Sequence, residues 1–280
     1  MFVVGMLSFR IMTTSHTTER WALILGASSG FGAATARELA KHGFHIAGVH
    51  LDRKATLPNV EQLVQELQKA GRKTLFFNVN AADPQKRAEI LTQLESSLKA
   101  STPPGQIAVV MHSLAFGSLK PYIAADPKDA LTKEQMEMTL DVMGNSLVYW
   151  VQDLFTRKLI GPGSRIFAMT SSGGRRVWPT YGAVSAAKAA LESHMRQLAL
   201  ELAPHGITAN TIRAGVTNTP ALRKIPGNEQ MMEFAKLKNP HHRLTTPEDV
   251  AQAIATLSNS GTQWITGNVI GADGGEDIIG

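Results

Sequence analysis

The sequence predicts an α/β fold, in which helices cover both faces of a doubly wound parallel sheet within a single domain. From residue 21 onward, short runs typical of buried strands alternate with segments whose apolar residues recur at helical spacing. Strands joined by helices pair in parallel, through right-handed crossovers. A glycine-rich turn at residues 26–32 lies between the first strand and the first helix, as in Rossmann-type domains. With 280 residues, 43% of them hydrophobic, the chain can bury one large core.

The expected elements follow one another in regular order, and several carry their own start or stop signal. Gly43 and Gly71 stand where the first two helices should end, and Asp83-Pro84 opens the third with an N-cap followed by proline. Strands are expected at Trp21–Leu25, His45–Val49, Thr74–Val79, Ile107–Met111, Arg165–Met169, Ile207–Ile212 and Asn268–Ala272, and helices at Ala33–His42, Asn59–Ala70, Pro84–Lys99, Lys133–Leu159, Tyr181–Ala203 and Pro247–Leu257.

Two segments depart from this alternation. Residues 217–245 contain Pro220, Pro226 and Pro240 together with several charges. Because this stretch is too long for an idle connection, it predicts a lid over a site. Residues 1–20 are expected to form a flexible N-terminal arm, since their apolar start is too short for a secretory signal, and residues 21–280 form the domain itself.

Composition excludes several classes of function. The absence of cysteine rules out a disulfide scaffold, a thiolate metal site and a cysteine nucleophile, and it suits a reducing compartment such as the cytoplasm. No histidine spacing typical of a metal site occurs. The net charge is +5, but the 28 basic residues include no run of five or more, which argues against a nucleic-acid binder. The apolar stretches are too short for a membrane span.

The glycine-rich turn reads Gly26-Ala-Ser-Ser-Gly30-Phe-Gly32. Glycine lets the backbone approach a pyrophosphate, and the free N–H groups at the start of the following helix bind its charge. The spacing G-x-x-x-G-x-G resembles the T-G-x-x-x-G-x-G of the short-chain dehydrogenases/reductases, and the resemblance runs from about Trp21 to Gly275. It implies a Rossmann-type reductase domain that binds a nicotinamide dinucleotide.

The resemblance also bears on which dinucleotide is bound. In the family, an acid at the end of the second strand binds the ribose hydroxyls, but that position is His50 here. Asp52 and Arg53 follow, and the missing acid together with Arg53 favours NADPH, with NADH left open. Contacts to the cofactor are expected from Gly26, Ser28, Ser29, Gly30, Phe31, Gly32, His50, Leu51, Asp52, Arg53, Asn78, Val79, Ser113, Leu114, Ala115, Lys188, Gly215, Val216, Thr217 and Thr219.

The spacing of Tyr181 and Lys188 identifies a branch of this family. Most members have Tyr-x3-Lys, but Val184 stands at that position and the chain has Tyr-x6-Lys instead. Seven residues make almost two helical turns, so both side chains share one helix face. In reduction of an α,β-unsaturated thioester the hydride adds to C3 while charge develops on the C1 oxygen, farther from the nicotinamide. A displaced tyrosine suits that geometry, and Tyr-x6-Lys resembles the enoyl-acyl-carrier-protein reductases.

Other stretches support this branch. Residues 112–116 (HSLAF) are similar to the His-Ser-Ile-Gly-Phe of enoyl reductases, and Met143 replaces the helix asparagine of ordinary members. Residues 210–221 (NTIRAGVTNTPA) resemble the segment that borders the nicotinamide, although Val216 stands where most relatives have proline and is expected to loosen the loop. Ser171 occupies the place of a second tyrosine in many enoyl reductases, and ordinary members keep their catalytic serine there.

The resemblance therefore implies an NAD(P)H-dependent enoyl-acyl-carrier-protein reductase of fatty acid synthesis. Tyr181 would hold the thioester oxygen, Lys188 the ribose hydroxyls, and Ser171 would assist at the carbonyl. The expected partners are an enoyl thioester on acyl carrier protein and three further copies in a homotetramer. Two alternatives remain: a short-chain carbonyl, hydroxysteroid or 3-oxoacyl reductase that relies on Ser171, and a non-catalytic NAD(P)-sensing regulator.

Overall fold

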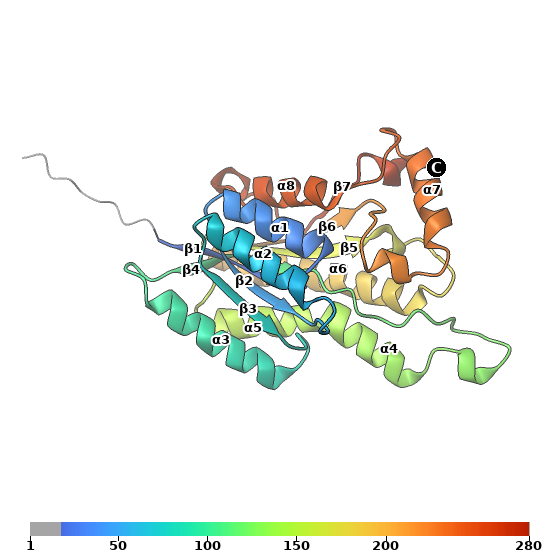
Figure 1. Cartoon of the computed structure of the whole chain (residues 1–280), viewed down its shortest axis with the longest axis horizontal. Coiled ribbons are helices and arrows are strands. Elements are labelled where there is room, and N and C mark those ends of the chain that lie inside the picture. Colours follow the sequence, from blue (N-terminus) through green and yellow to red (C-terminus); the bar gives the residue numbers. More distant parts are fainter. Residues whose placement is uncertain (1–17, 280) are drawn as a thin grey trace, which may run out of the picture.

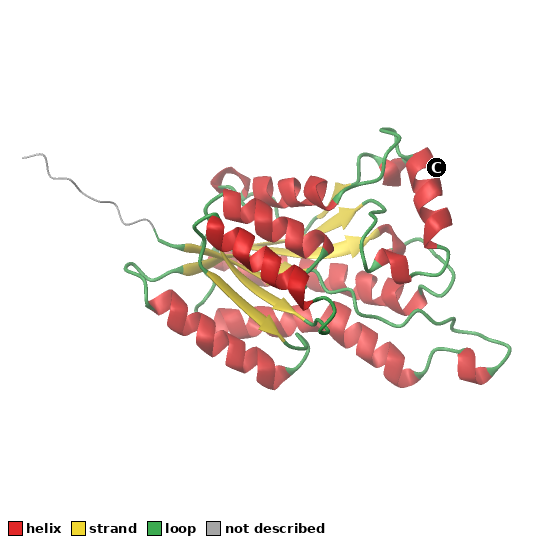
Figure 2. Ribbon diagram, viewed as in Figure 1, coloured by secondary structure: helices red, strands yellow, loops and turns green. Residues whose placement is uncertain are grey.

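The computed structural model describes residues 18–279, which form one layered α/β domain (Figures 1 and 2). Seven strands make a single parallel sheet in the order β3-β2-β1-β4-β5-β6-β7. The order reverses between β1 and β4, which is the switch point where doubly wound folds bind ligands at the carboxyl ends of the strands. The predicted fold class is confirmed.

The observed elements match the expected ones closely, with ends that move by at most three residues. Pro84–Lys99 and Pro247–Leu257 are helices with the expected bounds, since each begins at a proline that follows a capping side chain, Asp83 or Thr246. The strands are β1 (Arg20–Leu25), β2 (His45–His50), β3 (Thr74–Asn78), β4 (Gln106–His112), β5 (Arg165–Ser171), β6 (Thr208–Ala214) and β7 (Val269–Ala272), and the helices are α1 (Gly30–Lys41), α2 (Leu57–Lys69), α3 (Pro84–Lys99), α4 (Lys133–Leu140), α5 (Ser146–Thr156), α6 (Gly182–Leu202), α7 (Asn228–Lys238) and α8 (Pro247–Leu257).

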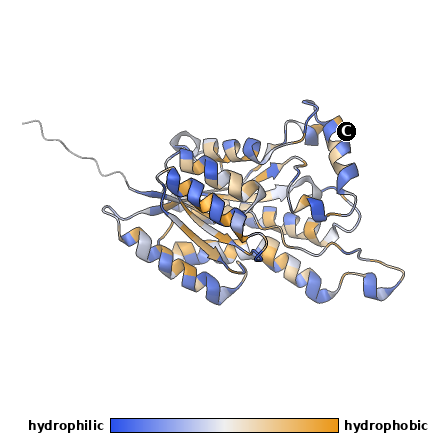
Figure 3. Ribbon diagram, in the orientation of Figure 1, coloured by the Kyte–Doolittle hydropathy of each residue, from blue (hydrophilic) through white to orange (hydrophobic). Residues whose placement is uncertain are grey.

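The core lies in two apolar layers, one on each face of the sheet. In β1, Leu23 and Leu25 point into the layer formed with α3, α5 and α6, while Ala22 and Ile24 point into the layer formed with α1, α2 and α8. This alternation follows from the two-residue period of a strand, and it explains why a central strand is apolar at every position. The surrounding helices carry hydrophilic residues beside hydrophobic ones, as amphipathic helices do (Figure 3).

The expected long helix at Lys133–Leu159 is interrupted. It consists of α4, a π-helical turn at Asp141–Asn145, and α5, which ends at Thr156. The wide turn brings Ser146 under β4, where its hydroxyl donates to the Val142 carbonyl (2.8 Å) and pairs with His112 Nε2 (2.9 Å). Helical spacing does not reveal such a turn, because it changes the hydrogen-bonding pattern of the backbone; π-turns of this kind often occur beside functional sites.

The 217–245 segment is more ordered than its prolines suggested. It contains a 3₁₀ turn at Leu222–Lys224 and the helix α7, which lies at the same end of the molecule as the C-terminal residues (Figure 1). Ile225 is buried, and the Pro226 carbonyl accepts a hydrogen bond from Trp178 Nε1 (3.1 Å). The segment is therefore fixed against the loop that precedes Tyr181.

At the N-terminus, β1 begins at Arg20, the last residue of the expected arm. Arg20 pairs with Gln106 in the sheet, and its guanidinium lies 4.1 Å from the centre of the Phe44 ring. Residues 1–17 lie outside the described part of the chain, so the arm stays a prediction. Among the helices of residues 18–279, none has both the length and the apolar character that crossing a bilayer requires.

Candidate active site

Two chain segments converge on the glycine-rich turn at the carboxyl ends of the strands. A Cβ on Gly26 would come within 2.4 Å of the Ser113 carbonyl oxygen, and one on Gly32 within 2.0 Å of the Gly26 carbonyl oxygen. Gly30 lies against Thr219, where a Cβ would be 3.3 Å from Cγ2. The fold thus brings together three of the predicted cofactor segments: the turn itself, residues 113–115 and residues 215–219.

The backbone of the turn has the features of an anion-binding site. Gly26 and Gly30 have positive φ angles (89° and 51°), which glycine adopts without steric cost. Ser29 is the N-cap residue of α1, but its side chain makes no capping hydrogen bond. The first N–H groups of α1 are left without that acceptor, and together with the helix dipole they favour an anion at this position.

The end of β2 carries a small polar network. His50 is buried, and its Nδ1 lies 3.0 Å from Asp52 Oδ2. The side-chain amide of Asn78 accepts a hydrogen bond from the Asp52 N–H (2.8 Å) and donates one to the Asp52 carbonyl (3.0 Å). Burial acts to raise the pKa of the Asp52 carboxyl, but hydrogen bonds from Thr56, Ser28 and His50 bring it below the ordinary value. An ionised carboxylate therefore lies beside the glycine-rich turn, two residues later than the family pattern places its acid.

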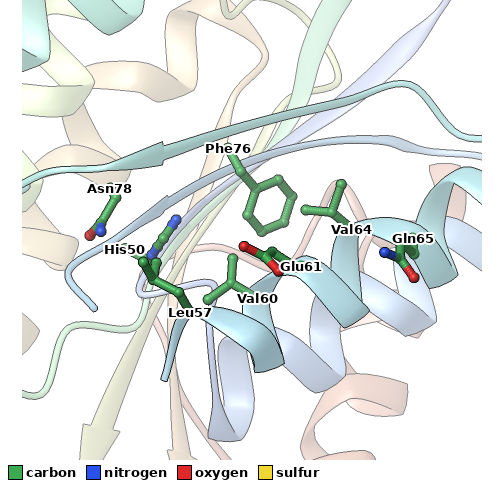
Figure 4. A pocket seen from close by; sticks show the side chains of 8 residues that line it. All are labelled: His50, Leu57, Val60, Glu61, Val64, Gln65, Phe76 and Asn78. Atoms are coloured by element: carbon green, nitrogen blue, oxygen red, sulfur yellow. The ribbon is translucent and has the colours of Figure 1, made fainter. Parts of the chain in front are cut away.

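Other residues expected to contact the cofactor differ in their exposure. Val79 and Leu114 pack against the same core layer. Leu51 is 62% exposed, and Arg53 and Ala115 are exposed as well. An open apolar groove of about 370 Å³ adjoins His50 and Asn78 and is bounded by β3 and α2 (Figure 4). Tyr181, Lys188 and Ser171 do not line this groove.

Tyr181 and Ser171 meet at Gly173. A Cβ on Gly173 would lie 2.5 Å from Tyr181 Cε1 and 3.3 Å from Ser171 Oγ, so glycine is needed for the close approach. The Gly173 N–H donates to Ser171 Oγ (3.1 Å), and the Ser185 hydroxyl of α6 donates to the Gly173 carbonyl. Tyr181 is the N-cap residue of α6 and is partly buried. Burial raises the pKa of its phenol, and the Ser171 hydroxyl acts in the opposite direction.

Lys188 lies on the same helix and is buried. Its Nζ donates to the Met169 carbonyl at the end of β5 (2.7 Å), which holds the ammonium at the carboxyl edge of the sheet. Burial lowers the pKa of this ammonium to about 8, against the raising effect of Glu192 one turn further on. The Thr170 hydroxyl donates to Glu192 Oε1 (2.6 Å) and so fixes the carboxylate.

His112 reaches the same edge from β4 and is fully buried. Burial and then the Lys188 charge lower the pKa of His112 to about 3, so its imidazole is neutral at physiological pH. Nε2 pairs with Ser146 and Nδ1 has no partner among residues 18–279. Asn145 turns away and pairs with His194 (3.0 Å), and Met143 is buried in a small cluster with Val184, which leaves neither as a polar group of this site.

Residues 215–219 form a tight loop after β6. Thr217 is buried and donates to the Gly215 carbonyl (2.9 Å), and Thr219 Oγ1 accepts from Leu222 N (3.2 Å). The expectation that Val216 loosens this loop is not met: its N–H donates to the Glu276 carboxylate. Sequence reasoning missed Glu276 and Glu192, because their partners are distant in the chain or lie on another element.

A doubly wound sheet, a glycine-rich turn after its first strand, and a tyrosine that caps the helix carrying a buried lysine are features of the short-chain dehydrogenase/reductase class of nucleotide-dependent oxidoreductases. The family model described as enoyl-(acyl carrier protein) reductase matches residues 26–276, and the chain belongs to this family.

Individual relatives share the fold at modest identity. An uncharacterized oxidoreductase of Bacillus subtilis is 29% identical over 93% of this chain and 98% of its own. The NADH-dependent enoyl-acyl-carrier-protein reductase of Aquifex aeolicus is 28% identical over 89% of this chain and 90% of its own. A solved structure of the Aquifex aeolicus enzyme has a TM-score of 0.77 at 25% identity, and the match covers 94% of this chain and 97% of that one. A promiscuous keto-reductase of lugdunomycin biosynthesis has a TM-score of 0.78 and 28% identity, over 93% of this chain and 98% of that one. The relatives thus include both carbon–carbon and keto reductases.

Proposed function

We propose that the protein reduces the C2–C3 double bond of a trans-2-enoyl thioester with NADPH. The observation that carries the proposal is the position of Tyr181, which precedes α6 as its N-cap residue, seven residues before the buried Lys188. In this reaction a hydride adds to C3, the π electrons move to the C1 oxygen as an enolate, and C2 then takes a proton. The reduced nicotinamide supplies the hydride when it is bound.

The side chains have distinct tasks in this proposal. The Tyr181 hydroxyl donates to the C1 oxygen as negative charge develops there, which is stabilisation that exists mainly in the transition state. The Lys188 ammonium holds the ribose hydroxyls, and the Ser171 hydroxyl favours a polarised phenol. Ser171 touches the same glycine as Tyr181 and assists at the carbonyl. Apolar residues of the 217–245 lid, with Ile225 already buried, exclude water from the acyl chain.

The choice of NADPH rests on the charges after β2. Arg53 is exposed and available to a 2′-phosphate, whereas the Asp52 carboxylate would repel one. Because Asp52 is already engaged by His50 and the Asn78 amide holds its backbone, we assign the phosphate contact to Arg53. Replacing Arg53 with alanine should then raise the KM for NADPH and leave that for NADH unchanged.

A carbonyl reductase is the second candidate. It is favoured by the Ser171 hydroxyl, which lies beside Tyr181 as a second donor for a ketone oxygen. In that reaction the hydride adds to the carbon that bears the oxygen, so the two candidates differ in the substrate that is consumed.

The proposed setting follows from the substrate. Four basic side chains in or near α7 would meet the acidic surface of an acyl carrier protein in the cytoplasm, within a homotetramer. They are Arg223, Lys224, Lys236 and Lys238.

The test is nucleotide oxidation by the purified protein. NADPH or NADH is offered with crotonyl-coenzyme A or an enoyl-carrier thioester, beside an acetoacetyl thioester. Oxidation with the enoyl substrates alone is the expected result, and oxidation with the ketone alone would overturn the proposal in favour of the second candidate. No oxidation with any of them, despite nucleotide binding, would favour a non-catalytic sensor.

Tyr181→Phe tests the assigned chemistry. Removing one oxyanion donor should lower kcat by about 10²-fold while the Kd for NADPH stays within twofold. Tyr149→Phe is the matched control, because Tyr149 is a partly exposed tyrosine on α5 whose ring faces Arg87. Equal losses of turnover and of nucleotide binding in Tyr181→Phe would contradict the role.

A further inference from the structure

The last described residues pack against the loop Gly215–Thr219. After β7, Gly274 and Gly275 take positive φ angles (61° and 83°), and Glu276–Ile278 form a 3₁₀ turn. Glu276 is buried at 9% exposure, and the Asp277 side chain is exposed to only 5%. Two neighbouring acidic side chains are thus turned into the protein at its C-terminal end, although desolvating a carboxylate costs free energy.

Glu276 is directed at the backbone of the Gly215–Thr219 loop. Its Oε2 and Oε1 lie 3.0 and 3.3 Å from the Val216 nitrogen, and among residues 18–279 this N–H is the donor that reaches the carboxylate. The approach is so close that a Cβ on Gly215 would come within 2.8 Å of Glu276 Oε2 and 2.3 Å of Thr245 Oγ1. Glycine at 215 and glutamate at 276 are therefore matched to each other.

Val216 supplies the donor. A proline here would fix its own φ angle and carry no N–H, so it would need no partner. With valine, the backbone gains both rotational freedom and a polar N–H group, and a buried N–H without an acceptor is costly. The carboxylate of Glu276 compensates for both changes, because it accepts the hydrogen bond from the Val216 N–H and restrains the backbone of the loop.

Asp277 anchors the same turn from its other side. Its carboxylate pairs with Arg213 at the end of β6 (3.1 Å) and with Arg176 (3.3 Å), and Arg175 also contacts it. The Asp277 carbonyl accepts a further hydrogen bond from Arg176 (2.8 Å). Arg175 and Arg176 belong to the loop between Ser171 and Tyr181, so the C-terminal turn links the two loops that border the site.

We propose that Glu276 is a positioning residue, which holds residues 215–217 in the shape that receives the nicotinamide end of the cofactor. It acts through the Val216 N–H and does not touch the cofactor itself. The inference rests on the proposed role of the 215–219 loop in nicotinamide binding, and it does not depend on which substrate is reduced. Asp277 keeps the turn in place, so that the Glu276 carboxylate reaches Val216.

The experiment measures the Kd for NADPH in the full-length protein by quenching of tryptophan fluorescence, together with the thermal midpoint of each variant. Glu276→Ala removes the acceptor and should weaken NADPH binding about tenfold, which is the size of one lost charge-assisted hydrogen bond. Glu276→Gln keeps an amide oxygen as acceptor and should recover part of the affinity. Glu248→Ala, an exposed glutamate of α8, is the control and should leave the Kd unchanged.

The decisive variant is the double substitution Glu276→Ala with Val216→Pro. Proline removes the donor and restrains the backbone by its ring, so it should restore the Kd to within about threefold of the wild-type value. That rescue would not occur if Glu276 only stabilised the fold. A Kd unchanged in Glu276→Ala, with a lowered thermal midpoint, would overturn the proposal, as would a Kd that the double substitution leaves as weak as in Glu276→Ala.

Failure of this inference is distinguishable from failure of the proposed function. The binding measurement needs no substrate, so wild-type protein that binds NADPH without reducing an enoyl thioester still provides the test. If wild-type protein reduces the thioester and Glu276→Ala binds NADPH normally, the positioning role alone is refuted.

Discussion

At the scale of single residues, the site depends on a cation that is kept in the interior. Lys188 is buried, donates to the Met169 carbonyl, and has its pKa lowered by burial from 10.5 to about 8. Since one pKa unit corresponds to about 1.4 kcal/mol, the charged form costs on the order of 3 kcal/mol in the folded state. In the proposed function, activity depends on a charge that burial disfavours.

Turnover and stability should therefore change in opposite directions above pH 8. As pH rises through about 8, folded Lys188 loses its proton, and kcat/KM should fall with an apparent pKa near that value. Between pH 8 and 10.5 the unfolded chain still binds the proton that the folded chain has lost, so the contribution of Lys188 to the free energy of unfolding rises. The measurement is the difference in unfolding free energy between wild type and Lys188→Met across this range. A difference that does not vary with pH would contradict the lowered pKa.

At the scale of elements, the connection from β1 to α1 is fixed by contacts between backbones. Gly32 in the first turn of α1 lies directly over the Gly26 carbonyl, and no flexible side chain separates them. Backbone cannot yield as a side chain can, so an added methyl group must displace the whole turn. Packing alone therefore requires glycine at position 32.

Gly32→Ala should lower both nucleotide affinity and stability. Overpacking of this kind typically costs about 1–3 kcal/mol, and the displaced turn should weaken the Kd for NADPH at least tenfold. Gly261→Ala is the matched control, because a Cβ at Gly261 meets nothing within 4 Å. Calorimetry of nucleotide binding and thermal unfolding of both variants test this expectation, and normal NADPH binding by Gly32→Ala would show that the turn tolerates the methyl group.

At the scale of the whole molecule, the sheet has an exposed edge at β7. Trp264 is 98% exposed just before this strand, and Val269 within it is 37% exposed. An uncovered strand edge beside large apolar side chains is typical of an interface between chains. Gly267 lies against Ala199 of α6, so this surface is continuous with the helix that carries Lys188. The homotetramer expected from the family resemblance would cover it.

Val269→Lys should break that assembly. A lysine on an edge strand opposes pairing with a second chain, so light scattering after size-exclusion chromatography should show four chains for wild type and fewer for the variant. Leu237→Lys, an equally polar change at an exposed residue of α7, should leave the mass unchanged. A monomeric wild type would contradict the expected assembly, and a tetrameric Val269→Lys would place its interface elsewhere.

The motifs of the candidate site are short-range patterns. The glycine-rich turn lies within seven residues and Tyr-x6-Lys within eight, so their chemistry is written in adjacent sequence. Caps such as Asp83-Pro84 fixed helix ends for the same reason. The π-helical turn at Asp141–Asn145 was missed, because it depends on Ser146 and His112, which only the fold brings together.

The sequence by itself determined the fold class, the glycine-rich turn between β1 and α1 and the seven-residue spacing of Tyr181 and Lys188, since strand and helix periods and helical spacing are local properties. Only the tertiary structure decided which charges surround them. Asp52 turns back to His50 because Asn78 on the neighbouring strand holds its backbone. Glu276 meets Val216 across 60 residues of chain. Such contacts depend on how separate elements pack, and no local pattern in the sequence encodes them.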